Sequence, residues 1–220
     1  MDTPKGKDLK DIFHGALRSG NFGKSRIDAF SDGVFAIVIT LLILEIRVPH
    51  IHDIYASREL LDGLVGLTPK FLSYILSFAY ISIYWVNHHQ LFHLIKFADR
   101  GLFWFNNFFL MCLAFIPFPT ALIGEYPGNS TAVIFYGIVM FVTAASFGVM
   151  KWYAVEIGRL VDPQVEGQLL KSSVFKIVLG PVLYFIAILA ALVSTPTAIA
   201  IYVLIPVIYF FPGKLEKLQR

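Results

Sequence analysis

Long apolar runs alternate with short polar segments along most of the chain. Six such runs occur, at residues 26–49, 71–95, 102–123, 131–153, 174–194 and 196–212. About 20 helical residues, each rising about 1.5 Å, cross the roughly 30 Å hydrocarbon core of a bilayer. The pattern therefore predicts an all-α integral membrane protein with one six-helix transmembrane domain over 26–213 and tails at 1–25 and 214–220. The last run is short, so five helices are the alternative.

The composition agrees with a membrane protein and excludes several other classes. Hydrophobic residues make up 57% of the chain and charged residues 15%, whereas soluble domains carry about 25% charged residues. Basic residues form no dense run suited to nucleic acid. Cys112 is the only cysteine, which excludes an intrachain disulfide. No enzyme or cofactor motif occurs, and His50 and His52 give only a weak metal signal, so we expect no enzyme, cofactor or metal site.

Lysine and arginine positions predict the orientation, because cytoplasmic loops carry an excess of both. With the N-terminus in the cytoplasm, all of the 18 basic residues except Arg47, Arg58 and Lys70 lie in inner segments. An even number of helices places the C-terminus on the same side. The sequence therefore predicts a multi-pass membrane protein with both tails cytoplasmic.

The first run carries an ionisable residue, Asp32, just inside its apolar part. A carboxylate in a membrane costs a few kcal/mol unless it is paired, so it needs a partner or a function. At about 100° per residue, a largely apolar seam follows one side of this helix and consists of Gly33, Ile37, Thr40, Leu41, Leu44 and Val48. Asp32 and Ser31 point away from the seam. We therefore expect the seam to face copies of itself, and Asp32 to be buried among the other helices of its own chain.

Three groups of polar residues share one depth near the cytoplasmic edge. They are Ser31 and Asp32, His88 and His89, and Asn106 and Asn107. Buried polar groups need partners, and these can supply one another, with Asp32 accepting from His88 and Asn106. One interpretation is a proton or ion site, and the other is a structural network that locks the first helix to the next two. The direction of Asp32 favours the structural network.

A ring of subunits with the first helix at the axis is an economical way to build a pore, since six helices are few to enclose one. Ile37, Leu41 and Leu44 would then face the axis, where apolar rings exclude water and resist ion passage. Thr40 lies about 60° from Ile37, so its hydroxyl either faces the pore or bonds to the carbonyl of Ala36. No T-V-G-Y-G filter sequence occurs. From the residues alone, the seam is a pore lining or an ordinary packing contact.

Two short motifs carry a family resemblance. R-x-x-x-F-S-D begins at Arg26, at the head of the first helix, and W-x-x-H begins at Trp85, at the end of the second. With the six-run layout, they resemble the transmembrane protein 175 family of potassium channels. The residues similar to that family's structural network are Arg26, Phe30, Ser31, Asp32, Trp85, His88 and Asn106.

The resemblance implies a potassium-conducting channel without the usual filter, in which the first helix lines the pore. Bacterial members have one six-helix unit per chain and assemble as homotetramers, and a single motif in 220 residues matches that form. The family's constriction, which serves as gate and selectivity element, falls on Ile37, Leu41 and Leu44, and its nearby threonine falls on Thr40. The implied partners are other copies and the lipid of a bacterial inner membrane, with potassium as the permeant ion.

Two other functions stay open at this point. A proton-coupled secondary transporter would use Asp32 and His88, but such transporters usually show internal repeats and broken helices at mid-membrane. A structural membrane protein that conducts nothing is the third candidate.

Overall fold

The computed structural model describes residues 23–53, 55–161 and 178–210. Its helices are α2 (Lys24–Leu44), α3 (Ser57–Gly66), α4 (Thr68–Leu94), α5 (Arg100–Ala114), α6 (Pro117–Glu125), α7 (Ser130–Trp152), the π-helical turn η1 (Tyr153–Ile157), a helix over Val178–Ala191 and α9 (Thr195–Phe210). These ranges contain no β-strand, only an isolated bridge between Ile95 and Val161. The all-α class is therefore confirmed for the described part of the chain.

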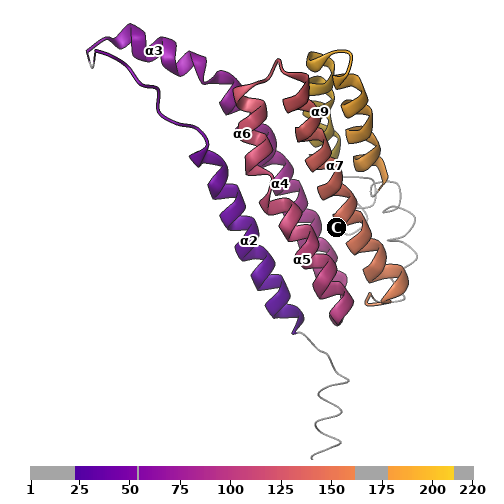
Figure 1. The fold of residues 1–220 in the computed structure, drawn as a ribbon. Coiled ribbons are helices and arrows are strands. Elements are labelled where there is room, and N and C mark those ends of the chain that lie inside the picture. Colours follow the sequence, from indigo (N-terminus) through magenta and orange to yellow (C-terminus); the bar gives the residue numbers. More distant parts are fainter. Residues whose placement is uncertain (1–22, 54, 162–177, 211–220) are drawn as a thin grey trace, which may run out of the picture.

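The helices form a bundle with α2 on one flank (Figure 1). Helix α4 packs against α2, α6 and α9, and helix α5 packs against α2 and α7. Helix α3 leads into α4 and extends past the end of α2, away from the bundle (Figure 1). Because the other described helices lie to one side of α2, the part of the chain that the structure describes leaves much of the opposite side of α2 uncovered.

Short polar side chains and a proline set the helix starts. Asp99 Oδ1 accepts a hydrogen bond from Leu102 N at 2.8 Å at the head of α5. Asn129 Oδ1 accepts one from Thr131 N at 2.9 Å at the head of α7, and both bonds satisfy first-turn N–H groups that lack helical partners. Pro117 stands in the first turn of α6, where its missing N–H is tolerated. The third apolar run is thus broken between α5 and α6, where Pro117 stands.

The structure supports a membrane-spanning chain but leaves the number of spans a prediction. Within the described ranges, three helical segments are long and apolar enough to cross a bilayer, namely Lys24–Leu44, Arg100–Glu125 and Ser130–Ile157. The pair α3 and α4, bent by 43°, makes a fourth candidate, while Val178–Ala191 and Thr195–Tyr209 are shorter apolar helices. Residues 1–22 of the predicted N-terminal tail, residues 162–177 and residues 211–220 lie outside the described residues, so the start of the fifth predicted run, the end of the sixth and the predicted C-terminal tail are not described.

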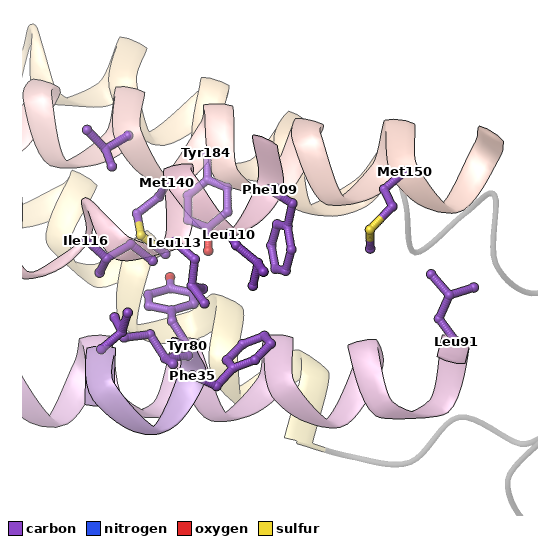
Figure 2. Close-up of a cluster of buried hydrophobic side chains, with 14 of the residues drawn as sticks. Phe35, Tyr80, Leu91, Phe109, Leu110, Leu113, Ile116, Met140, Met150 and Tyr184 are labelled. Carbon is purple, nitrogen blue, oxygen red and sulfur yellow. The ribbon is translucent and has the colours of Figure 1, made fainter. Parts of the chain in front are cut away.

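The core is aromatic and joins α2, α4, α5 and α7 (Figure 2). Phe35 of α2 lies against Phe109 of α5, with ring centroids 6.1 Å apart. Tyr80 of α4 donates its hydroxyl proton to the carbonyl of Tyr202 at 2.6 Å, and the Tyr202 hydroxyl donates to the carbonyl of Val133 at 3.1 Å. A membrane interior supplies no water to such hydroxyls, so each finds an acceptor on a neighbouring helix.

Close packing between α4 and α6 rests on small residues. Ser73 and Ser77, four residues apart, are both buried on the α6 side of α4. A Cβ atom at Gly124 would lie 2.6 Å from Ser73 Oγ, so only glycine permits this approach. Thr120 of α6 donates to Ser77 Oγ at 2.7 Å, which ties the two helices by a hydrogen bond as well as by contact.

Candidate functional site

Helix α2 has two apolar faces with different environments. Its buried residues are Ile27, Ser31, Phe35, Val38 and Leu42, spaced three or four apart. That spacing places them on one stripe, and the stripe packs against α4 and α5. The predicted seam lies on the other side, where the exposed fractions of Ile37, Leu41 and Leu44 are 59%, 41% and 68%. The α2 seam is therefore free to contact lipid or another copy of the chain.

A buried hydrogen-bonded network anchors the opposite face of α2. Asn106 Nδ2 donates to Ser31 Oγ at 2.9 Å, and Ser31 Oγ donates to the carbonyl of Ile27 at 2.8 Å. Asn106 Oδ1 lies 2.8 Å from His88 Nε2. Because this amide oxygen can only accept, Nε2 of His88 carries the proton. We call Ser31, His88 and Asn106 the buried anchor. Their hydrogen bonds join α2, α4 and α5, and each bond has a defined donor and acceptor.

Aromatic rings enclose the imidazole of this anchor. The ring of His88 stacks on Phe92, with centroids 4.2 Å apart and an interplanar angle of 18°, and it meets Phe35 edge-on at 5.5 Å. Within the described residues, His88 Nδ1 and Asp28 Oδ1 are buried atoms without a hydrogen-bond partner. The sequence interpretation missed Asp28, although it stands one helical turn before Asp32 on the same helix.

The prediction that Asp32 is buried and accepts from His88 and Asn106 is wrong. The Asp32 side chain is exposed in the single chain, and its Oδ1 accepts instead from Trp85 Nε1 at 2.9 Å. Ser31 lies within the buried stripe, whereas Asp32 lies about 100° further round the helix, at the edge of that stripe. Ser31 therefore takes the place in the anchor that the sequence interpretation gave to Asp32.

The seven residues of the predicted network form two separate groups with two members outside both. Ser31, His88 and Asn106 make the buried anchor, while Asp32 and Trp85 make a second, exposed pair. Arg26 and Phe30 are exposed in the single chain, with Phe30 at 57%. On the helical wheel Arg26 and Phe30 lie on the side of the α2 seam, whereas Asp32 lies about 140° from Ile37.

The hydroxyl of Thr40 bonds to the backbone of its own helix. Its Oγ1 lies 2.8 Å from the carbonyl oxygen of Ile37 and 3.0 Å from that of Ala36, and the side chain is exposed. The predicted bond to Ala36 is therefore present. An exposed threonine that donates inward still offers its oxygen lone pairs outward.

No cluster of three or more metal-binding side chains occurs in the described ranges. His52, part of the weak signal in the sequence, places Nδ1 3.0 Å from Glu59 Oε1 on the surface. This is a surface contact between the loop that holds His52 and helix α3.

A double-mutant cycle tests the pair formed by Asp32 and Trp85. Asp32→Ala and Trp85→Phe should each lower thermal stability in detergent, and the double variant should lose less than the sum, with a coupling energy of about 1 kcal/mol. Trp104→Phe is the matched control, because Trp104 is 60% exposed on α5 and should not couple to Asp32. If the stability losses of Asp32→Ala and Trp85→Phe simply added in the double variant, the hydrogen bond between Asp32 and Trp85 would be contradicted.

Comparisons with known proteins agree with these features. The family model of the endosomal/lysosomal potassium channel TMEM175 matches residues 26–117, which hold both motifs and the buried anchor. The chain is 37% identical over 190 residues to a protein of Streptomyces collinus named potassium channel, covering 84% of this chain and 91% of that protein. It is 26% identical to a chicken protein named endosomal/lysosomal proton channel TMEM175, but spans only 39% of that longer protein.

A solved structure shows the same fold. The crystal structure of a lysosomal potassium-selective channel TMEM175 homolog from Chamaesiphon minutus superposes with a TM-score of 0.75 at 34% identity. The match covers 84% of this chain and 95% of that one. The resemblance inferred from two short motifs is thus confirmed over most of the sequence, and the chain belongs to the TMEM175 family, a family of ion channels and not of enzymes.

Proposed function

We propose that this protein is a potassium-conducting channel of a bacterial inner membrane, with both termini in the cytoplasm. Four copies would surround an axis lined by α2. The observation that carries this proposal is the α2 seam, an apolar stripe that the chain's own helices leave uncovered. Potassium as the permeant ion is supported by the bacterial relatives named potassium channel and by the Chamaesiphon homolog described as potassium-selective.

The seam provides a hydrophobic constriction rather than a binding site for ions. Ile37, Leu41 and Leu44 project from one side of α2 over about 10 Å of helix length. An ion passing such rings would lose hydration without oxygen atoms to replace it, which raises a steep barrier. The same residues therefore serve as gate and as selectivity element, because the barrier depends on how readily each ion sheds water.

The buried anchor sets the rotation of α2 about its own axis. A shift of one residue in the packing of α2 would turn the helix by about 100° and remove Ile37 from the axis. Ser31 accepts from Asn106 only in the observed rotation. The network is therefore structural in this proposal and takes no part in moving ions.

The transporter alternative loses the cluster on which it depended. Asp32 and His88 bond to different partners, Trp85 and Asn106, so the described residues offer no direct relay between them. Proton conduction has separate support in the name of the chicken relative, and the experiment on function includes it as an outcome.

Current through the purified protein in a planar bilayer tests the proposed function. With potassium on one side and sodium on the other, the reversal potential should lie close to the potassium equilibrium potential. A reversal potential that follows an imposed pH gradient would indicate a proton channel instead. Saturable flux that requires a second gradient would indicate a transporter, and absence of current from intact oligomers would indicate a structural protein.

Thr40→Ala should lower the potassium-to-sodium permeability ratio while leaving assembly intact. Thr40 borders the proposed constriction, and its exposed side chain places Oγ1 2.8 Å from the carbonyl oxygen of Ile37. The control is Thr143→Ala on α7, where the hydroxyl makes the same kind of bond, to Val139 at 2.8 Å, but is buried away from α2. An unchanged reversal potential for Thr40→Ala would show that this hydroxyl serves the helix alone.

A further inference from the structure

Helix α3 is an amphipathic helix without a buried residue. Its apolar side chains Leu60, Leu61, Leu64 and Val65 are exposed by 39%, 59%, 45% and 63%. At about 100° per residue these four side chains fall within about 140° of one another, with Arg58 at the edge of this face and Glu59 and Asp62 outside it. Four exposed aliphatic side chains on one ten-residue helix form an apolar patch, and such patches mark a surface that contacts a partner or a membrane.

The loop that precedes α3 contacts it on the side opposite to its apolar face. The backbone N–H of His52 donates to Glu59 Oε1 at 3.0 Å, and the same oxygen lies 3.0 Å from His52 Nδ1. A Cβ atom at Gly63 would lie 2.9 Å from Pro49, so the loop approaches the helix closely there. Glu59 and Gly63 lie on the side of α3 away from Leu61. The loop therefore fixes the helix with its apolar face directed away from its own chain.

The direction and charge of α3 do not suit a bilayer surface. Helix α3 makes an angle of 43° with α4, so its far end lies about 11 Å beyond the start of α4 along the α4 axis. Helices that lie in a membrane interface usually carry several basic residues and aromatic anchors. Here Arg58 is outnumbered by Glu59 and Asp62, and the apolar face has no aromatic residue.

A cleft of about 490 Å³ opens at the same outer level of the chain. Its floor and walls come from the end of α2, the start of α4 and the end of α6. The apolar lining includes Leu42, Tyr74 and Ala121, and the charged lining includes Glu45 and Arg47. Lys70 and Glu125 close one side with an ion pair of 2.5 Å. This outer cleft is large enough for several aliphatic side chains and carries charges of both signs at its edge.

We propose that α3 of one subunit docks into the outer cleft of a neighbouring copy of this chain. Helix α3 extends past the outer end of α2 (Figure 1), and α2 also contributes Leu42, Glu45 and Arg47 to the cleft. When α3 of one copy enters a cleft made by other residues of the next copy, the contact is head-to-tail, and repeating it generates a closed ring if the rotation between copies closes. The proposal rests on the oligomeric channel proposed above and adds a second contact outside the pore.

Disulfide cross-linking tests this contact. With Cys112 replaced by alanine, Leu61→Cys and Ala121→Cys are combined in one chain, oxidised in the membrane and separated without reducing agent. Dimers and higher species should form at least about fivefold more than in the control Asp62→Cys with Ala121→Cys, because a disulfide needs Cβ atoms within about 4.5 Å. Independently, Leu64→Asp should lower the fraction of intact oligomer in detergent about twofold or more, since it charges the docking face.

Three results would overturn the proposal. A cross-link confined to single chains would place the cleft contact within one subunit. A fluorophore on Leu61→Cys quenched by spin-labelled lipid, without cross-linked dimers, would assign the apolar face to the bilayer. In both cases, an intact oligomer that conducts potassium leaves the proposed function standing. A monomeric parent protein without current would instead remove the docking proposal and the channel together.

Discussion

Channels with Ile37→Asn should pass larger currents and discriminate less between potassium and sodium while remaining assembled. Isoleucine is stiff at χ1 because it is branched at Cβ, so a ring of four would form a narrow, dry constriction. Asparagine supplies amide oxygens and admits water, which lowers the barrier for every small cation. Because each 1.4 kcal/mol of barrier corresponds to about a tenfold change in rate, we expect conductance to rise by at least about tenfold.

The control for this prediction is Ile43→Asn on the same helix. Ile43 is 44% exposed but lies about 120° from Ile37 around the helix. The same change there should affect conductance little and cost stability instead. If Ile37→Asn gave silent, dissociated protein, the seam would be a dry packing contact, because an unpaired amide would then be buried in it. Bilayer recording and size-exclusion chromatography of both variants decide between a pore lining and a packing contact.

Replacing Asn106 should destabilise each chain by about 1–3 kcal/mol, because a buried partner is left unsatisfied. Asn106→Ala removes the acceptor of His88 Nε2 and the donor to Ser31 Oγ in one step. It also leaves His88 buried with both ring nitrogens unpaired. Thermal unfolding in detergent measures the loss, and the surviving channels should keep their unitary conductance.

Asn107→Ala provides the matched comparison for Asn106. Asn107 is the next residue on α5 and is only partly buried, so its removal should cost much less than that of Asn106. Normal stability of Asn106→Ala combined with altered selectivity or proton permeation would contradict the structural role of the anchor. Such a result would instead indicate that the buried anchor is part of the conduction path.

The helix periodicity of α2 was sufficient to distinguish its faces but not to assign every residue. Both faces of α2 are apolar, but a helical-wheel projection separates the seam around Ile37 from the side that carries Ser31. Asp32 was misplaced because charge was taken as a sign of burial, whereas packing put its uncharged neighbour Ser31 in the core. The partner of Asp32, Trp85, lies 53 residues away, and its choice depends on the rotation of α4.

Other features depend on tertiary contacts that no local pattern contains. The break between α5 and α6 coincides with Pro117. Asn106 was correctly expected at the depth of Ser31 and His88, to which it bonds. The outer cleft assembles residues from α2, α4 and α6, and the orientation of α3 depends on its contacts with Pro49 and His52. Periodicity marks an amphipathic helix in such a segment, but not the side that its own chain covers.

Thiol modification at the outer end of the seam would show whether α2 lines a potassium pore. With Cys112 replaced by alanine, Leu44→Cys and Ile43→Cys channels would be recorded in potassium while a charged methanethiosulfonate reagent is added from the outer side. Leu44 is 68% exposed on the seam and Ile43 is exposed off it. We expect the potassium current through Leu44→Cys to fall irreversibly, whereas the current through Ile43→Cys should persist. Equal currents before and after modification of Leu44→Cys, with labelling confirmed by mass, would contradict a pore lined by α2.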